Sequence, residues 1–321
     1  MSTPLYSWGR FPHNPQRGHR CVWLDDLPAH LDKVIGEHST SLPYGNGRSY
    51  GDSCLASSDQ VLHMHSLDRL IEADWDTGVL KVEAGITLAD VLAVAIPRGW
   101  FLPVTPGTQF ATVGGAIAND VHGKNHHVRG TFGRHVRGFG LLRHGQPELV
   151  CSPSVNASLF SASIGGLGLT GVIHWAELQL MPIRASQIDT TTVRFAHLAE
   201  FFSLSDELDD KHEYSVAWVD CLAKGADTGR GVFIVGDHAQ YGSLEVGRRP
   251  KLSMPITPPV SLINKLSLGA FNNLYWRVHP SQRTLGRSAY EPFFYPLDRI
   301  LHWNRIYGRR GFQQYQCVIP T

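Results

Sequence analysis

The sequence contains no hydrophobic run long enough to cross a membrane as a helix. Its most apolar stretch, residues 159–180, is interrupted by four glycines and by His174 and Glu177, whereas a spanning helix needs about 20 mostly apolar residues. The first 20 residues also lack the apolar segment of a secretory signal peptide. We therefore expect a cytoplasmic protein that contacts the inner membrane surface peripherally at most.

Cysteines are few, and the net charge is close to zero. The five cysteines, at positions 21, 54, 151, 221 and 317, form no CxxC pair, and a scattered odd number indicates reduced thiols instead of a disulfide framework. The 29 Lys and Arg residues nearly balance 28 Asp and Glu residues, and no tail carries charge of one sign. This balance argues against a nucleic-acid partner.

Glycine, in contrast, is abundant and concentrated in the first part of the chain. The 32 glycines are densest at residues 45–51, 107–145 and 165–171. Between these clusters, apolar patterns predict strands at 60–64, 79–84 and 172–180. Residues 86–100 predict a helix with Thr87 as its N-cap and Gly99 at its end.

The chain changes character after Pro182, where glycine becomes rarer. Apolar patterns predict strands at 190–195, 215–220, 293–295 and 313–319, and a helix at 196–209. Four prolines between residues 250 and 259 predict a loop. Regular alternation of strands and helices is absent, so we expect an α+β protein instead of a doubly wound fold. We expect one domain over residues 1–182 and a second over residues 183–321.

The first glycine cluster reads Gly45-Asn46-Gly47-Arg48-Ser49-Tyr50-Gly51-Asp52. Alternating glycines let backbone N–H groups approach an anion, and Arg48 adds a fixed charge. The segment is neither a Rossmann fingerprint nor a Walker A loop, since no clear helix follows and GK[ST] is missing. Its pattern fits both a diphosphate-binding loop and an ordinary glycine-rich turn.

The second cluster, Thr112–Ala118, offers a flat surface of small residues that suits a planar ring, or a helix that starts tightly against a sheet. His122, His126 and His127 follow it in the spacing HxxxHH. Only Asp120 adds a further ligand type, so we expect no metal and interpret the histidines as a loop beside a cofactor. The third cluster, residues 165–171, allows close backbone approach to the far end of a dinucleotide.

Together these motifs resemble the flavoprotein oxidases of the vanillyl-alcohol oxidase (PCMH-type) superfamily, and the likeness extends over nearly the whole chain. That resemblance implies an FAD-binding domain of two α+β subdomains and a substrate domain built on an antiparallel sheet. The matching segments are 45–52, 106–108, 112–118, 122–127, 132–137, 168–171, 303–308 and 314–320.

Carried over by position, the resemblance implies bound FAD. Many relatives attach FAD through a histidine in the first loop, and Arg48 occupies that place here, so we expect a non-covalent cofactor. The implied cofactor-binding residues are Gly45, Asn46, Gly47, Arg48, Ser49, Tyr50, Gly51, Asp52, Ser53, Gly107, Thr112, Val113, Gly114, Gly115, Asn119, Asp120, Val121, His122 and Ile173.

The likeness is greatest to the branch of this superfamily that oxidises a polyprenylphosphoryl-ribose. It implies oxidation of a sugar secondary alcohol to a ketone by hydride transfer to flavin N5, with His122, Tyr50 and Gln316 at the reacting centre. The implied substrate is a small or lipid-linked sugar, and a short-chain reductase is a possible partner that takes the keto product. The apolar segment 252–268, flanked by Lys251 and Lys265, is the expected groove edge.

Two alternatives stay open at this point. The chain also fits an aldonolactone or sugar-alcohol oxidase of the same superfamily. Because the superfamily's chains continue past the segment 314–320, we further expect an incomplete substrate domain that lacks a pocket lysine and cysteine. In that case the chain is a truncated FAD-binding remnant without turnover.

Overall fold

The computed structural model describes residues 3–247 and 252–316. Up to Pro182 the chain forms a five-stranded antiparallel sheet, a three-stranded parallel sheet and a two-stranded pair. Their orders are β4-β5-β9-β7-β8, β1-β3-β2 and β10-β6. The strands are β1 (Arg17–Arg20), β2 (Leu42–Tyr44), β3 (Gln60–His63), β4 (Leu70–Asp74), β5 (Val79–Glu83), β6 (Trp100–Phe101), β7 (Val136–Leu142), β8 (Leu149–Cys151), β9 (Val172–Gln179) and β10 (Met181–Pro182).

The predicted helix after residue 86 is confirmed, together with its start and its end. Thr87 accepts a hydrogen bond from the Asp90 N–H at the N-cap, and Gly99 takes a left-handed conformation beyond the last turn. The helices of this half are α1 (Leu27–His38), α2 (Leu88–Ala95), α3 (Val113–Ala118), α4 (His126–Arg129) and α5 (Ala157–Ser163). Short 3-10 turns are η1 (Leu24–Asp26), η2 (Met64–Ser66), η3 (Ile96–Arg98) and η4 (Phe132–His135).

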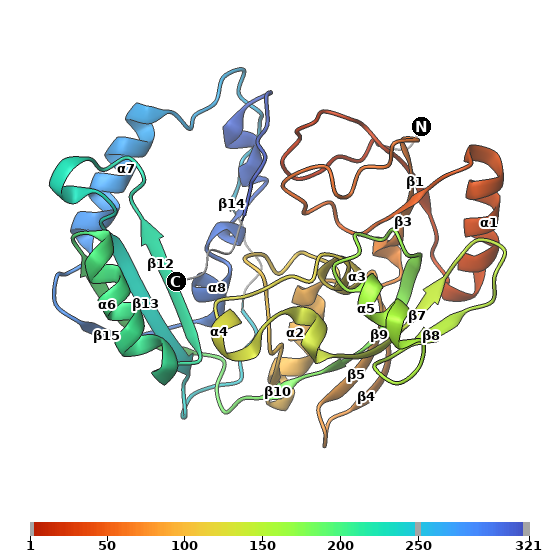
Figure 1. The fold of residues 1–321 in the computed structure, drawn as a ribbon, viewed down its shortest axis with the longest axis horizontal. Helices are drawn as coiled ribbons and strands as arrows, with labels where there is room; N and C mark the ends of the chain where they lie inside the picture. The colour runs from red at the N-terminus through yellow and green to blue at the C-terminus, as the bar shows by residue number, and fades with distance from the viewer. Residues whose placement is uncertain (1–2, 248–251, 317–321) are drawn as a thin grey trace.

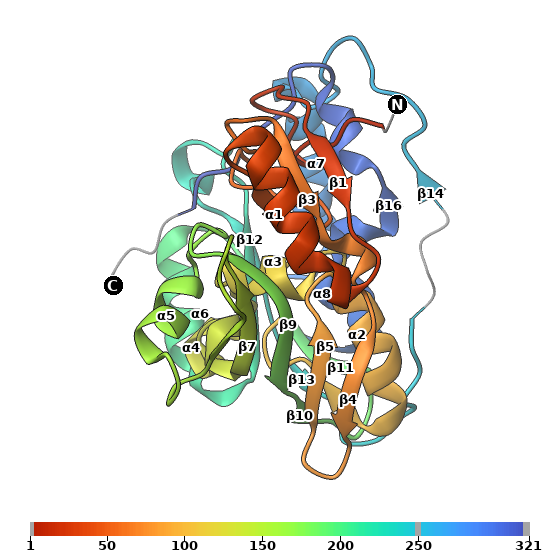
Figure 2. The same ribbon diagram turned by 90° about the vertical axis from the view of Figure 1, so that its right-hand side faces the viewer.

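Beyond Pro182 the chain builds a four-stranded antiparallel sheet in the order β12-β13-β11-β15. Leu204 and Leu208 of α6 pack with Phe195 and Phe233 of this sheet. Figures 1 and 2 show this sheet with α6 and α7 beside the sheets of the first half. The elements are β11 (Ile188–Phe195), α6 (Leu198–Leu208), η5 (Asp209–Lys211), β12 (Tyr214–Val219), η6 (Gly225–Asp227), β13 (Gly231–His238), β14 (Leu252–Ser253), α7 (Lys265–Val278), β15 (Thr284–Ser288), α8 (Tyr290–Phe294), η7 (Pro296–Arg299), β16 (Ile300–Leu301) and η8 (Trp303–Tyr307).

One apolar core joins the two halves. It runs from the five-stranded sheet through α2 and α3 to Tyr214, Phe294 and Tyr295 of the second half. Phe294 stacks at a tilt on Phe101, with ring centroids 5.4 Å apart. Because this core is continuous, α8 is held against the loops of the first half (Figure 1).

The predicted strand at 293–295 is wrong, since Phe293 and Phe294 lie in the helix α8. Phe293, Phe294 and Tyr295 are all buried. A strand would turn the middle residue to the opposite face, whereas a helical turn lets all three aromatic side chains enter one core.

The predicted strand at 313–319 is not formed at residues 313–316, which pair with no other strand in the described ranges. Its remaining residues, 317–319, lie outside the described residues. Of the predicted loop at 250–259, residues 250 and 251 lie outside the described residues; residues 254–259 are irregular, whereas Leu252–Ser253 pairs in parallel with Ile300–Leu301. Cys21, Cys54, Cys151 and Cys221 are free thiols. No helix within residues 3–247 and 252–316 is both long enough and apolar enough to cross a membrane.

A buried ion pair anchors α7 to the four-stranded sheet. Asp220, 2% exposed, accepts hydrogen bonds from the Arg230 guanidinium (2.8 Å) and from the Asn272 amide (2.7 Å). Burial raises the pKa of Asp220, but the bonds from Arg230 and Asn272 outweigh burial and leave that pKa below its usual value. The ionised carboxylate is therefore the form that the fold favours.

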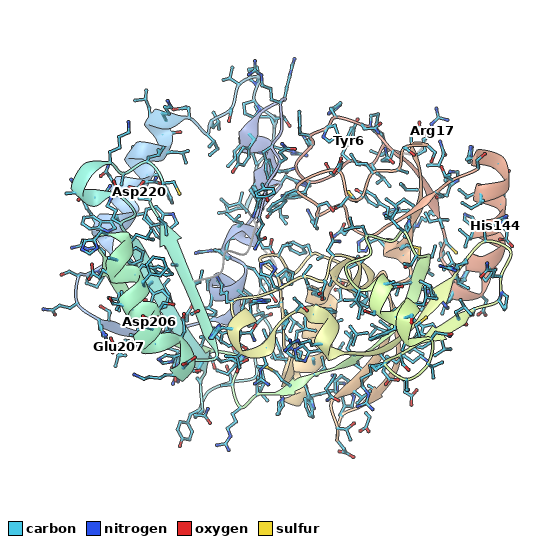
Figure 3. All side chains as sticks on the ribbon, in the orientation of Figure 1. Tyr6, Arg17, His144, Asp206, Glu207 and Asp220 are labelled. Carbon is cyan, nitrogen blue, oxygen red and sulfur yellow. The ribbon has the colours of Figure 1, made fainter. Side chains whose placement is uncertain are left out.

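Replacing Asp220 by alanine should lower the free energy of unfolding by about 3–5 kcal/mol, because it leaves the Arg230 charge buried without its main partner. Chemical denaturation at neutral pH measures this change. Asp206→Ala, on the exposed side of α6, is the matched control and should have little effect (Figure 3). Since the folded-state pKa of Asp220 is lowered, its contribution is present above the unfolded value and disappears as pH falls through the folded value. An equal loss in both variants would contradict this assignment.

Candidate functional site

A cavity of about 850 Å³ lies between the glycine-rich loops of the first half and the segments that follow β15. The first half supplies residues of segments 43–54, 106–124 and 167–173, and the second half supplies Phe294, Pro296, Leu297, Gln314 and Gln316. The predicted site residues that line this cavity are Gly45, Asn46, Gly47, Arg48, Ser49, Tyr50, Gly51, Asp52, Ser53, Gly107, Thr112, Gly114, Gly115, Asn119, Val121, His122, Ile173 and Gln316.

Two residues of the predicted set, Val113 and Asp120, do not line the cavity wall. Val113 is fully buried in the core at the start of α3. The Asp120 carboxylate instead accepts a hydrogen bond from the Gly133 N–H, at 2.9 Å. Val113 therefore belongs to the core, and Asp120 fixes the turn at Gly133.

The first loop approaches the start of α3 closely, and glycine makes this approach possible. A Cβ on Gly45 would lie 2.3 Å from the Thr112 hydroxyl oxygen. Gly47 takes φ +59°, a left-handed conformation that side chains disfavour. The Asn46 amide donates to the Phe110 carbonyl at 2.8 Å, which ties this loop to the segment before α3.

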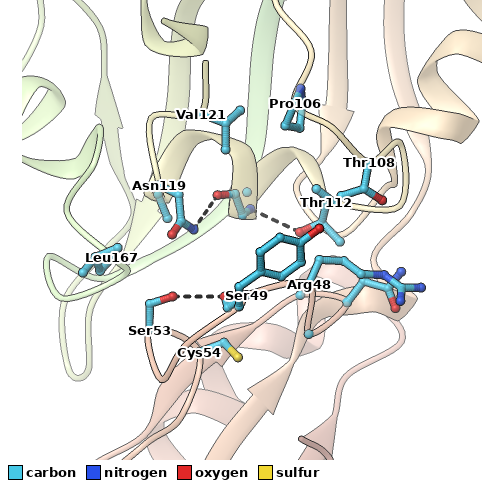
Figure 4. Close-up of a pocket in the computed structure, with 18 of the residues that line it drawn as sticks. Arg48, Ser49, Ser53, Cys54, Pro106, Thr108, Thr112, Asn119, Val121 and Leu167 are labelled. Carbon is cyan, nitrogen blue, oxygen red and sulfur yellow. Dashed lines mark hydrogen bonds between the residues drawn. The ribbon is translucent and has the colours of Figure 1, made fainter. Parts of the chain in front are cut away.

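Helix α3 begins and ends at polar residues that face the same cavity (Figure 4). The Thr112 hydroxyl accepts a hydrogen bond from the Gly115 N–H at 3.1 Å, and the Asn119 amide donates to the Gly115 carbonyl at 2.9 Å. Gly114 packs on Ala84, where a Cβ would lie 3.1 Å from that methyl group. The small residues therefore let the helix lie directly on the sheet.

Arg48 is held by aromatic rings from two other segments. Its guanidinium lies 4.0 Å from the Trp8 ring centroid and 5.3 Å from that of Phe110. Burial lowers the pKa of Arg48, and its Nε is buried without a hydrogen-bond partner among the described residues. An arginine stays charged under these conditions, so the first loop carries a positive charge at a defined place.

The cavity fits a large, flat ligand that carries negative charge. A Cβ on Gly51 or Gly107 would meet no atom within 4 Å, so the wall is open at both positions. Glycine backbone, the Arg48 charge and the flat face of α3 match the needs of a diphosphate and of a ring system. The residues present therefore fit FAD.

The three predicted catalytic residues all line the cavity. The Gln316 amide donates to Nε2 of His122 at 2.5 Å. Burial and the neighbouring His126 lower the pKa of His122, which keeps the imidazole neutral and able to accept a proton at pH 7. Burial, aided by Asp298, raises the pKa of Tyr50 to about 12, so its hydroxyl is a hydrogen-bond donor.

Lys124 is a cavity residue that the sequence motif contained but that was not assigned a role. It follows His122 by two positions, and burial lowers the pKa of its ammonium group to about 8. Phe294, Pro296 and Leu297 were also missed, because the expected strand at 293–295 gave no reason to place them at the cofactor. The motif HGK, next to a glycine cluster, was the sequence pattern that could have identified Lys124 as a cavity residue.

The histidine cluster does not gather into a ligand set. His126 contacts the ring of His122, with centroids 5.8 Å apart, whereas His127 Nε2 lies 3.1 Å from the Asp209 carbonyl. Across residues 3–247 and 252–316, no group of three or more His, Cys, Asp or Glu side chains is arranged to hold a metal ion.

Comparison with known proteins agrees with the assignment of FAD to this cavity. Residues 33–152 match the model of the FAD binding domain family. The chain is 35% identical over 288 residues to the decaprenylphosphoryl-beta-D-ribose oxidase of Mycolicibacterium smegmatis, covering 86% of this chain and 62% of that protein. It is 39% identical over 255 residues to an uncharacterized protein of Streptomyces coelicolor, covering 73% and 67%.

A third similarity covers less than half of the chain. The mouse L-gulonolactone oxidase is 33% identical over 141 residues, which is 43% of this chain and 31% of that enzyme. The chain thus spans about three fifths of the length of the Mycolicibacterium protein. Its residues 33–152 belong to the FAD binding domain family, and its cofactor is FAD.

Proposed function

We propose that the chain oxidises a secondary alcohol of a sugar to a ketone, and that the sugar is a polyprenylphosphoryl-ribose. Bound FAD supplies the hydride acceptor for this chemistry. One observation carries the proposal: the neutral His122 and the glycine surface that fits FAD line the same cavity. The 35% identity to an oxidase of decaprenylphosphoryl-ribose supports this choice of substrate.

In this proposal His122 takes the hydroxyl proton. A sugar hydroxyl that replaces the Gln316 amide at Nε2 of His122 donates its proton there as the carbon loses a hydride. The alcohol thereby loses two electrons and two hydrogens and becomes a ketone. The Tyr50 hydroxyl donates a hydrogen bond that orients the sugar.

Two features support an anionic, lipid-linked sugar over a neutral lactone. The Lys124 ammonium, charged below about pH 8, lines the same cavity as His122 and offers a cation to a phosphate there. The expected groove edge carries exposed Ile256, Val260 and Leu262, which suit a polyprenyl chain. Of its flanking lysines, Lys251 lies outside the described residues.

Further elements belong to the same proposal. Because Arg48 occupies the loop position of the covalent histidine, FAD is bound without a covalent link. A short-chain reductase consumes the keto product, and contact with the membrane surface is peripheral. The domains are residues 1–182 and 183–321, which agrees with the position of the three sheets of the first half before the four-stranded sheet.

Anaerobic mixing of the FAD-loaded chain with polyprenylphosphoryl-ribose tests the proposal. Loss of the visible flavin absorbance is the expected result, because hydride transfer reduces the cofactor. Reduction by an aldonolactone alone would favour the second candidate, which the similarity to L-gulonolactone oxidase supports. Failure of both compounds to reduce the bound flavin would overturn the proposal and favour an FAD-binding chain without turnover.

A further inference from the structure

The segment 105–109, which lines the cavity at Pro106, Gly107 and Thr108, is held by side chains from the other half of the molecule. The Asp298 carboxylate accepts hydrogen bonds from the Gln109 N–H at 2.8 Å and from the Thr108 hydroxyl at 3.1 Å. These partners lie about 190 residues away in sequence.

A second side chain, Tyr295, lies three residues before Asp298 in the sequence and contacts the same segment. The Tyr295 hydroxyl and the Thr105 hydroxyl share a hydrogen bond of 2.6 Å. Tyr295 is fully buried and Asp298 is 6% exposed. Tyr295, at the start of the 3-10 turn η7, and Asp298, within it, thus present two buried polar groups to one loop, and neither residue lines the cavity itself.

The loop has little regular structure of its own. Residues 105–109 belong to no helix or strand, although the Gln109 carbonyl accepts from the Ala89 N–H at 2.8 Å. Burial raises the pKa of Asp298 above its usual value and outweighs the bonds from Gln109 and Thr108 and the nearby Arg48, which lower it. The Asp298 carboxylate is therefore hydrogen-bonded to the segment 105–109 and also attracts the charge of Arg48 in the first glycine loop.

We propose that Asp298 is a positioning residue for FAD, which fixes the segment 105–109 in its cofactor-binding conformation. Tyr295 assists it through Thr105. The second half of the chain thereby raises the FAD affinity of the first half. This inference rests on the bound cofactor and not on the proposed sugar oxidation, because it concerns FAD binding alone.

The test is the dissociation constant for FAD, measured on the deflavinated full chain by quenching of flavin fluorescence. Asp298→Ala should raise it about 10- to 100-fold, because two donors, one of them a backbone N–H, lose a charged acceptor. Asp298→Asn keeps an acceptor oxygen and should recover most of this loss. Tyr295→Phe should raise the constant severalfold.

Tyr290→Phe is the matched control. Tyr290 is a buried tyrosine at the start of α8, and its hydroxyl accepts a hydrogen bond from the Gly247 N–H at 3.2 Å instead of from the loop. Its FAD affinity should stay within about twofold of the original chain, and its visible flavin circular dichroism should be unchanged. If Asp298→Ala and Tyr295→Phe bind FAD as tightly as Tyr290→Phe, or if Asp298→Asn fails to recover affinity, the proposal is overturned. Should Asp298→Ala fail to fold, the comparison of Tyr295→Phe with Tyr290→Phe decides alone.

Discussion

Replacing His122 by alanine should slow reduction of the bound flavin by the sugar substrate about 10²- to 10⁴-fold, the usual contribution of a positioned general base. The FAD affinity should change less than about twofold, because His122 is not part of the glycine loop 45–53 that carries the Arg48 charge. Anaerobic single-turnover mixing separates the two quantities. A large loss of FAD affinity with an unchanged reduction rate would contradict the role of His122 as the base.

His127→Ala is the matched control for this experiment. His127 belongs to the same motif, but its ring contacts the backbone carbonyls of Asp209 and His212 and does not line the cavity. Its reduction rate should therefore stay close to that of the original chain. Equal slowing in both variants would point to a general disturbance of the loop.

The pH dependence of the same step follows from the state of His122. Only the neutral imidazole accepts a proton, so the rate should fall as pH decreases through the pKa of His122. Burial and His126 lower this pKa, so the fall should lie below the usual value for histidine, about 6.5. The His122→Ala variant should lack this acidic limb. An acidic limb that persists unchanged in the variant would assign it to another group.

Replacing Gly51 by valine should raise the dissociation constant for FAD about 10- to 100-fold, because branched side chains forced into occupied space cost about 1–3 kcal/mol. The protein itself should tolerate the change, since a Cβ at this position meets no protein atom within 4 Å. Fluorescence quenching of added FAD measures the effect, and thermal unfolding of the deflavinated chain measures stability.

Gly36→Val provides the matched control for Gly51→Val. Gly36 lies exposed in α1, and a Cβ there also meets no atom within 4 Å, but the residue does not line the cavity. We expect unchanged FAD affinity. If Gly51→Val bound FAD as tightly as Gly36→Val, the first loop would not be in contact with the cofactor.

Local features of the fold could be predicted where a short sequence pattern is compatible with only one local structure. The alternating side chains of residues 79–84 gave the strand β5, and Thr87 with Gly99 gave both ends of the helical segment. The glycine clusters likewise indicated the cavity wall, since close approach of loop to helix requires residues without a Cβ, as at Gly45.

The contribution of the second half could not be predicted in the same way. Three consecutive aromatic residues suggested a strand, but their common burial in one core favours the helix α8. Asp298 belongs to no sequence motif, and its hydrogen bonds form only because the tertiary fold places η7 against the segment 105–109. Arg48 was identified as a charge, but the two rings that hold it, Trp8 and Phe110, are brought together by the tertiary fold.

The absorbance spectrum of the purified chain, recorded before and after acid precipitation, tests the central claim most directly. Non-covalent FAD in this cavity predicts visible flavin bands that move entirely into the supernatant. Bands that stay with the precipitate would contradict the assignment of Arg48 to the place of a covalent histidine. Absence of flavin, even after incubation with added FAD, would contradict the cofactor site itself.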